Sequence, residues 1–340
     1  LIIQGAALNA INVDDGEHIA PSTDITIRNV LLRNGGGQGI KTAGVDGLYI
    51  DRVEALGWGP NGSAVDLVGT RDVLVEGSLF RNAVPGNGTG VQAKGGTSNV
   101  VIRANRFVNA NERAIQIGGS TDPPHFRPQP PGDVEASSII AEGNVIVNNG
   151  ASDLPSIRAA VSFVNTRDGL ARNNVFIRPS GYFVRILKEN YREGFVDTQN
   201  GTLTDNIMIW ESGDLWEAIN VGPGTDAGSF KFEGNQWYNR RFPSNSRLPL
   251  PSEEINGVYG IDPGVGETTL VPWAYDWGMW VVNTTNLDLT YAHESDDRLL
   301  LATPEGDAEL DLDQADPLIG SWNYTPIDTP DILVQAYSYV

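Results

Sequence analysis

A five-residue pattern recurs along most of this chain and limits its fold more than any other feature. Each copy has a residue that is usually small, then an aliphatic, a polar and a second apolar residue, and then a turn; one copy is Gly90-Val91-Gln92-Ala93-Lys94. The other copies begin at Ala10, Gly39, Ala64, Ala114, Ala160, Phe183 and Ala218. Their first aliphatic residues are 23 to 29 residues apart, with two longer steps of 46 and 35 residues. This period indicates a solenoid with one copy per coil, and the longer steps indicate coils that carry inserted loops.

The alternation within each copy is typical of a β-strand. Side chains of a strand point to opposite faces in turn, so the second and fourth positions face the interior and the third faces outward. The third positions are all polar: Asn12, Lys41, Asp66, Gln92, Gln116, Ser162, Arg185 and Asn220. If the strands stack in parallel, these side chains form one polar ladder on an outer face of the solenoid.

A second strand follows each copy and carries asparagine at one register, at Asn105, Asn144, Asn174, Asn206 and Asn235. Stacked asparagines can hydrogen-bond along a parallel stack, and asparagine tolerates the left-handed backbone of a corner. We therefore expect this second ladder to be structural. Neither leucine-rich spacing nor a helical period is present. The prediction is an all-β, right-handed parallel β-helix over residues 1–255.

The ends of the chain do not follow the repeat. Residues 256–340 lose the period and carry Trp273, Trp277, Trp280 and Trp322 beside two acidic runs. We expect them to form a Trp-rich, irregular C-terminal cap packed on the last coils, with a separate carbohydrate-binding module as the alternative. The chain opens directly on a strand, so the N-terminal cap that a solenoid needs is expected to be missing.

Charge narrows the range of partners. The chain has 43 acidic and 23 basic residues and a formal net charge of −20, which disfavours nucleic acid and anionic membranes. A locally basic groove could still bind an anionic polymer, because salt confines surface fields to roughly 10 Å. There is no apolar run long enough for a transmembrane helix. Cysteine is absent, so its usage does not indicate a redox compartment.

Two insertions leave the coils directly after polar-ladder residues. The proline-rich segment 120–132 follows the copy with Gln116 and carries His125 and Arg127. Its prolines exclude a strand, so we expect a loop that rises beside the ladder. A second insertion begins at Lys188, after the copy with Arg185. A substrate that lies on the ladder would meet both insertions.

Segments 90–96, 113–121, 126–128, 200–206 and 256–263 resemble secreted bacterial right-handed parallel β-helix proteins, most of them uncharacterised. A more distant similarity is to β-helical polysaccharide lyases of the chondroitinase B and alginate lyase type, which use a lysine and an arginine on adjacent coils for proton transfer. This resemblance implies Lys94 and Arg113 as the catalytic pair. Arg113 stands before Ala114-Ile115, however, whereas the family's arginine lies within the strand and precedes His-Gly.

The resemblance implies a defined chemistry. A lyase acting on a uronate removes the proton next to a carboxylate, which requires a base within reach and cations that neutralise charge. We expect Lys94 to be the base and Arg113 or Arg127 to neutralise the carboxylate. Substrate contacts are expected from Lys41, Asp66, Gln92, Gln116, His125, Arg127, Arg185 and Lys188, with His125 as a second candidate base. The protein would be a secreted monomer, extracellular or periplasmic, with an anionic polysaccharide as its partner.

Other interpretations remain open. An outward lysine is often only solvated, Arg113 could simply pair with Glu112, and Arg127 could anchor its loop. A glycoside hydrolase would need two carboxylates about 5 to 9.5 Å apart, for which Asp14, Asp15 and Asp66 are candidates. A C5-epimerase shares the first step of a lyase, and a glycan-binding adhesin would use the ladder without catalysis. No metal is expected with certainty, although calcium could bind at residues 14–17 or 311–313.

Overall fold

The computed structural model describes residues 1–16, 20–148, 158–211 and 213–265, and beyond them only the backbone of short strands. The chain divides into two compact units, Leu1–Pro263 and Gly264–Val340. The second unit contains antiparallel strands β27 (Trp280–Val282), β28 (Leu289–Ser295), β29 (Arg298–Thr303) and β30 (Gly306–Asp311), and the pair β31 (Ala315–Asp316) and β32 (Ser321–Trp322). Trp273 and Trp277 lie outside the described residues, and the packing of this unit as a cap stays a prediction.

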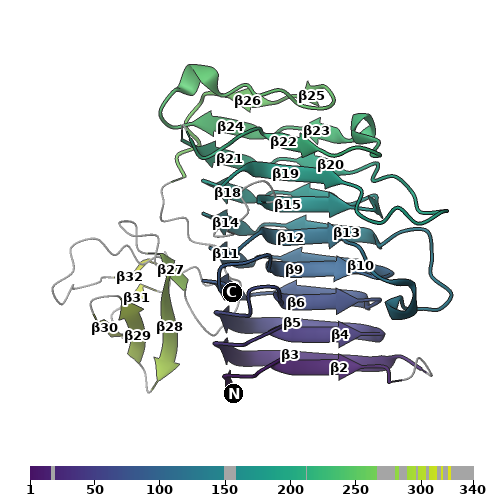
Figure 1. Ribbon diagram of the computed structural model, residues 1–340. Coiled ribbons are helices and arrows are strands. Elements are labelled where there is room, and N and C mark those ends of the chain that lie inside the picture. The colour runs from purple at the N-terminus through teal and green to yellow at the C-terminus, as the bar shows by residue number, and fades with distance from the viewer. Residues whose placement is uncertain are drawn as a thin grey trace. The chain divides into compact units, whose positions relative to one another are not determined.

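The first unit is a parallel β-helix, as the repeat predicts (Figure 1). The repeated pattern forms one eight-stranded parallel sheet, here called the ladder sheet, of β2 (Ile11–Asp14), β4 (Ile40–Ala43), β6 (Ser63–Val68), β9 (Thr89–Lys94), β12 (Arg113–Gly118), β15 (Ala159–Val164), β19 (Tyr182–Leu187) and β22 (Ile219–Val221). Its strands follow the sequence order of the coils, so residues far apart along the chain become neighbours.

The remaining faces of the coils belong to an 18-stranded parallel sheet, here called the long sheet. It consists of β1 (Ile2–Gln4), β3 (Ser22–Arg33), β5 (Val45–Leu56), β7 (Arg71–Glu76), β8 (Leu79–Arg81), β10 (Thr97–Arg103), β11 (Arg106–Val108), β13 (Ala136–Glu142), β14 (Val145–Val147), β16 (Thr166–Arg167), β17 (Leu170–Arg172), β18 (Val175–Ile177), β20 (Thr202–Thr204), β21 (Ile207–Trp210), β23 (Lys231–Glu233), β24 (Gln236–Asn239), β25 (Glu254–Ile255) and β26 (Val258–Tyr259). Three short 3₁₀ helices, η1 (Pro123–His125), η3 (Ala227–Ser229) and η4 (Pro243–Asn245), lie in the connections of the described residues.

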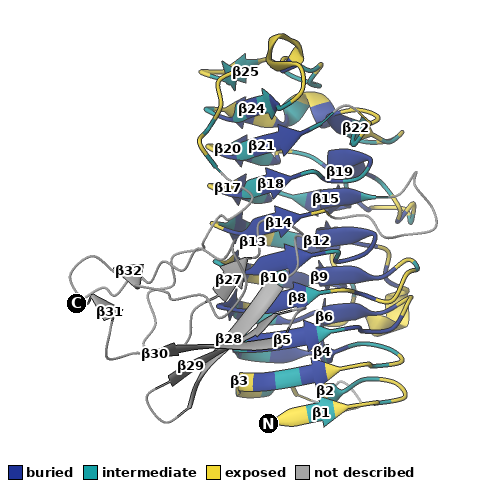
Figure 2. Ribbon diagram, turned by 90° about the vertical axis from the view of Figure 1, so that its left-hand side faces the viewer, coloured by how far each residue is buried: buried dark blue, intermediate teal, exposed yellow. Residues whose placement is uncertain are grey.

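The interior is filled by the aliphatic positions of the repeat. Ile40, Val65, Val91, Ile115 and Val161 occupy the second position of successive copies and are fully buried. Apolar burial between neighbouring coils supplies the main driving force for a solenoid. Figure 2 shows the strands of the middle coils as largely buried and the N-terminal strand β1 as largely exposed.

The asparagine ladder is confirmed as a structural device. The backbone N–H of Asn105 donates to Asn144 Oδ1, that of Asn144 to Asn174 Oδ1, and that of Asn174 to Asn206 Oδ1, each over 3.0 Å. Each side-chain amide also donates to a main-chain carbonyl of the preceding coil, as Asn144 Nδ2 does to Ile102 O at 2.8 Å. These bonds satisfy buried backbone groups where the chain turns between two strands.

One expectation about this corner is wrong. The ladder asparagines do not themselves adopt the left-handed backbone. The residue before each of them does, with positive φ at Ala104, Gly143, Asn173, Asp205 and Gly234. The left-handed turn therefore lies one residue earlier. Asparagine suits the ladder position because its side-chain amide can donate and accept hydrogen bonds at once.

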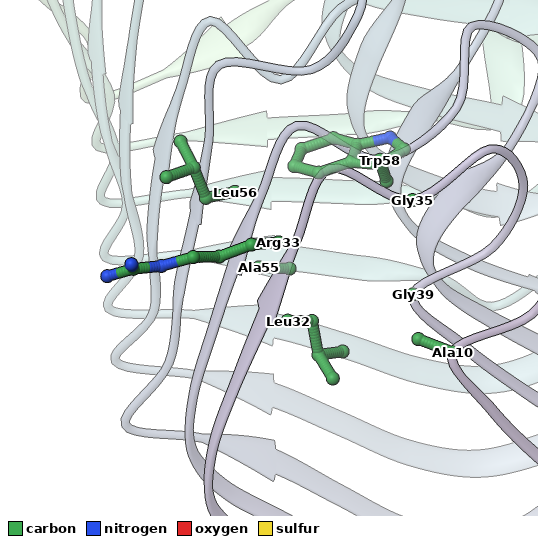
Figure 3. A pocket seen from close by; sticks show the side chains of 8 residues that line it. All are labelled: Ala10, Leu32, Arg33, Gly35, Gly39, Ala55, Leu56 and Trp58. Carbon is green, nitrogen blue, oxygen red and sulfur yellow. The ribbon is translucent and has the colours of Figure 1, made fainter. Parts of the chain in front are cut away.

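A small cavity lies in the first coils and is lined by Ala10, Leu32, Arg33, Gly35, Gly39, Ala55, Leu56 and Trp58 (Figure 3). Its volume of about 10 Å³ gives room for about one water molecule. It is too small for a sugar.

Candidate functional site

The polar third positions form one continuous ladder, as the sequence predicts. Pairings between adjacent strands place the eight side chains in a single register across the ladder sheet: Asn12, Lys41, Asp66, Gln92, Gln116, Ser162, Arg185 and Asn220. Neighbouring rungs of a parallel sheet are about 4.8 Å apart. The ladder is therefore long enough for several sugar units of an extended polymer.

Two lysines share one carboxylate near the middle of the ladder. Asp66 Oδ2 lies 2.7 Å from Lys41 Nζ and Asp66 Oδ1 lies 3.4 Å from Lys94 Nζ. The Asp66 side chain is 1% exposed, whereas those of Lys41 and Lys94 are 32% and 22% exposed. Lys94 Nζ also donates to Gln92 Oε1 at 3.3 Å. This group, the lysine cluster, presents a net positive charge of one to solvent.

A second charged group lies on the next coils. Arg113, at the start of β12, has a 7% exposed side chain that pairs with Glu112 at 2.8 Å and Glu189 at 2.9 Å. Its guanidinium also donates to Gln116 Oε1. Arg185 donates to Asn220 Oδ1 at 2.9 Å and lies over the ring of Tyr182. We call Glu112, Arg113, Gln116, Arg185 and Glu189 the arginine cluster.

Burial perturbs the titration of the arginine cluster. Burial raises the pKa of Glu112 from 4.5 to about 7, against the opposing effect of Arg113, and Glu189 raises it further while Arg185 lowers it. Burial and the nearby Arg113 lower the pKa of Arg185, although Glu189 and Glu112 act in the opposite direction. Glu112 is therefore a buried carboxyl that changes protonation near neutral pH.

This shift predicts a pH dependence of stability. The folded pKa of Glu112 exceeds its unfolded value, so the folded state binds the extra proton between about pH 4.5 and pH 7. Stability should fall as the pH rises through this window, by on the order of 3 kcal/mol. Urea unfolding at pH 5 and pH 7.5 measures the fall, and Glu112→Gln should remove most of it. An equal change in the free energy of unfolding between the two pH values in the wild-type protein and in Glu112→Gln would contradict the raised pKa of Glu112.

The two clusters meet at Gly119. A Cβ there would lie 3.1 Å from Lys94 Cβ and 3.3 Å from Gln116 Nε2. The absence of a side chain lets the stem of Lys94 and the amide of Gln116 pack against the same backbone. The lysine cluster and the arginine cluster therefore form one surface that extends from β4 to β19.

The insertion at 120–132 takes a different course from the one expected for Arg127. Arg127 Nε lies 2.7 Å from Asp15 Oδ2, with both side chains largely buried. Arg127 N donates to Gly95 O, and a Cβ at Gly69 would lie 2.1 Å from Arg127 Cβ. Arg127 thus anchors its loop to the glycine corners of earlier coils, which is the second of the two roles considered for it.

The anchor leads to a prediction. Arg127→Ala removes a buried ion pair that joins residues 112 positions apart, and leaves the Asp15 carboxylate without its guanidinium. We expect segment 120–132 to become at least about threefold more sensitive to a non-specific protease, because local opening rises when its anchoring contacts are lost. Limited proteolysis with mass mapping measures this. Arg172→Ala, which removes a half-exposed arginine on the long sheet, is the control and should leave cleavage of the loop unchanged.

The other predicted residues are placed as follows. His125 is exposed in η1, within the inserted loop. Lys188 Nζ lies 2.5 Å from Asp197 Oδ1 and near the ring of Tyr191, just beyond the end of β19. Sequence reasoning missed Glu112 as a titrating group and Glu189 altogether. Glu112 could have been found from its position beside Arg113, whereas Glu189 lies 76 residues from its partner.

A charged ladder on the long sheet provides a comparison. Its rungs are Arg28, Asp51, Glu76, Arg103, Glu142, Arg172, Thr204 and Glu233. Arg28–Asp51, Arg103–Glu76 and Arg172–Glu142 form ion pairs of 2.6 Å, so charges on this ladder largely neutralise each other. Structural pairing accounts for most of this surface.

The polar ladder is less completely satisfied. Among the described residues, Ser162 Oγ and Arg185 NH1 of the polar ladder are buried without a hydrogen-bond partner, and Asp66 Oδ1 has only the ion pair with Lys94 at 3.4 Å. The charged ladder contributes Asp51 Oδ1. An unsatisfied buried polar group costs about 1–3 kcal/mol and needs an explanation. A functional role for the polar ladder is one such explanation.

No group of three metal-binding side chains occurs among the residues whose side chains the structure describes. Glu17 and Asp313 lie outside those residues, so the two calcium candidates stay predictions. Within the described part of the chain, no helix has the length and apolar character needed to cross a bilayer.

The fold and the ladder define a parallel β-helix with one polar, partly cationic face. Residues 9–239 match the family model described as right handed beta helix region, and the chain belongs to this family. No curated protein matches the sequence.

Three solved structures are similar in fold. They are a mutant tailspike of E. coli bacteriophage HK620 with a pentasaccharide (12% identity, TM-score 0.42), an exopolygalacturonase from Thermotoga maritima (16%, 0.36) and an alginate lyase from Paenibacillus sp. str. FPU-7 (16%, 0.34). The matches cover 69%, 69% and 67% of this chain and 47%, 54% and 91% of those chains. The chain thus spans about half the length of the first two. These likenesses are too weak to carry an activity.

Proposed function

We propose that this protein is a polysaccharide lyase that cleaves a uronate-containing polysaccharide by β-elimination on the polar ladder. The main support is the lysine cluster: two partly exposed amines on one buried carboxylate, within an outward ladder of a chain whose net charge is −20. A local positive surface on an acidic protein favours an anionic ligand, because nearby cations dominate over distant charges at physiological salt.

In the proposed reaction Lys94 first gives its own proton to water and then, as the free amine, takes the proton from C5 of the uronate. The electron pair left on C5 forms the C4–C5 double bond, the C4–O4 bond breaks, and the departing O4 takes a proton from water. Lys41 stabilises the charge that develops on the substrate carboxylate, and Gln92 hydrogen-bonds a neighbouring hydroxyl. Lys41 replaces Arg113 and Arg127 in this role, because the side chains of those arginines are only 7% and 10% exposed in their ion pairs, whereas that of Lys41 stays 32% exposed beside Asp66.

A hydrolase is the second candidate. Asp14 and Asp66 lie two coils and two residues apart, roughly 12 Å by the spacings of a parallel sheet, which is too far for a catalytic pair. Glu112 and Glu189 fit better, since both lie within 2.9 Å of the same Arg113 nitrogen and Glu112 has the raised pKa of a general acid. Glu112 is buried, however, and Arg113 occupies the space between the two carboxyls.

The test uses the wild-type protein on a panel of uronate polymers, including polygalacturonate, alginate and chondroitin. A lyase produces unsaturated uronates, which absorb in the ultraviolet and increase with time. New reducing ends without that absorbance would support the hydrolase instead. Altered C5 configuration without cleavage would indicate an epimerase, and binding alone would indicate an adhesin. Assays with added calcium and with chelator test the calcium expectation.

Other expectations accompany this proposal. A polymer substrate cannot cross a membrane, so we expect the protein to be secreted, to the extracellular space or the periplasm. We also expect a monomer, which sedimentation of the whole chain would test.

A further inference from the structure

An aromatic pair borders the polar ladder on its last two strands, β19 and β22. Trp216 is 56% exposed and Tyr191 is 66% exposed, which is unusual for side chains of this size. Trp216 precedes β22, and its backbone N–H donates to Gly181 O, directly before β19. Trp216 therefore lies beside the beginning of β19.

Tyr191 lies at the opposite edge of the same strands. It follows the end of β19 by four residues, and a Cβ at Gly224, beyond the end of β22, would lie 3.9 Å from Tyr191 Cε1. A six-residue strand is about 20 Å long. The two exposed rings thus border the ladder on both sides.

A cation and a hydrogen-bonding amide lie between the two rings. Arg185, on the ladder, donates to Asn220 at 2.9 Å and lies 5.8 Å from the ring centre of Tyr182. Tyr182 in turn contacts Trp216 edge to face, at 5.9 Å between ring centres. Arg185 NH1 is buried without a hydrogen-bond partner. The guanidinium is therefore held in place by an aromatic stack and keeps unused donor capacity.

We propose that Trp216, Tyr191 and Arg185 form a binding subsite for a uronate unit of the polymer, separate from the lysine cluster. The apolar C–H face of a pyranose ring would pack on Trp216 and its carboxylate would bind Arg185, while Tyr191 would limit the subsite at the opposite edge of the ladder, about 20 Å away. This subsite rests on the proposed function and adds to it the direction of binding: the polymer runs along the solenoid axis and passes between the two rings.

The subsite lies several rungs from Lys94. Gln116 and Ser162 occupy the rungs between Gln92 and Arg185, so Arg185 is three coils from Gln92, or about 14 Å. A short oligomer that occupies the lysine cluster would not reach the aromatic pair, whereas a longer one would. A variant that damages only this subsite should therefore weaken binding of long oligomers alone, whereas a variant that disrupts the whole ladder should weaken binding of oligomers of every length.

The experiment is calorimetric titration of uronate oligomers of increasing length into proteins that carry Lys94→Ala, which keeps the ligand intact. Adding Trp216→Ala should weaken binding of long oligomers about tenfold and leave dimers unchanged, while Trp216→Phe should keep most of the affinity. Tyr191→Ala should weaken binding of long oligomers by a smaller factor, because Tyr191 borders the subsite at its far edge. Phe242→Ala, another exposed aromatic, is the matched control and should change nothing. Arg185→Gln should reduce the preference for free over methyl-esterified oligomers.

The outcomes separate the two proposals. Unchanged affinity for long oligomers in both Trp216→Ala and Tyr191→Ala would overturn the subsite, while uronate cleavage by the wild-type protein would still support the lyase. Failure of the wild-type protein to bind or cleave any uronate polymer would overturn the proposed function and the subsite with it.

Discussion

Replacing Lys94 with alanine is expected to lower kcat on the preferred uronate polymer by about 10²- to 10⁴-fold, the usual contribution of a general base. Lys94 Nζ lies in the partly exposed lysine cluster, 3.4 Å from Asp66 Oδ1 and 3.3 Å from Gln92 Oε1. Deleting it removes the base but leaves Asp66 paired with Lys41, so the fold should survive. Initial rates of ultraviolet absorbance measure the loss.

Two companion variants make this prediction specific. Lys231→Ala removes an exposed lysine from the long sheet and should retain full activity. Lys41→Ala should lower kcat, because Lys41 stabilises the charge that develops on the substrate carboxylate during the reaction. A Lys94→Ala protein with normal kcat would remove Lys94 from the mechanism, even if the polymer is cleaved.

Replacing Asn144 with alanine is expected to lower the free energy of unfolding by roughly 2–6 kcal/mol. Asn144 Oδ1 accepts from Asn105 N at 3.0 Å, and Asn144 Nδ2 donates to Ile102 O at 2.8 Å. Without the side chain, both buried backbone groups lose a partner, at about 1–3 kcal/mol each. Ordered water could enter only by opening the packed corner.

Urea unfolding followed by circular dichroism measures the effect, provided that the transition is reversible. Asn12→Ala is the matched control: this asparagine is exposed on β2 and bonds only with the Asn9 side chain, so its loss should change stability by less than about 0.5 kcal/mol. Equal unfolding midpoints for the Asn144 and Asn12 variants would show that the ladder does not stabilise the fold.

The sequence alone was sufficient for the coil period, the register of the polar ladder and the asparagine ladder. Each follows from spacing and alternation, which are properties of the chain in one dimension. The position of the left-handed turn before each asparagine was not predicted. Asparagine and the residue before it share the same corner, and composition does not tell which of them takes the positive φ.

The roles of the arginines depended on loops that the repeat does not describe. Judged by residue type alone, Arg113 and Arg127 could each bind a substrate carboxylate. The resemblance to lyases made Arg113 a catalytic candidate. In the folded chain both pair with distant carboxylates: Glu189 bonds Arg113 from 76 residues away, and Asp15 bonds Arg127 from 112 residues away. Such pairs form only when insertions fold back on particular coils.

The sequence alone therefore determined which side chains share the outer face of the ladder sheet. Parallel pairing of the repeated strands keeps the third position of each copy in one row. Only the tertiary structure decided which of those charged side chains are buried in ion pairs within the protein and which stay accessible to a ligand. The physical reason is that a side chain's partner depends on distance in space, and the irregular insertions set that distance independently of the repeat.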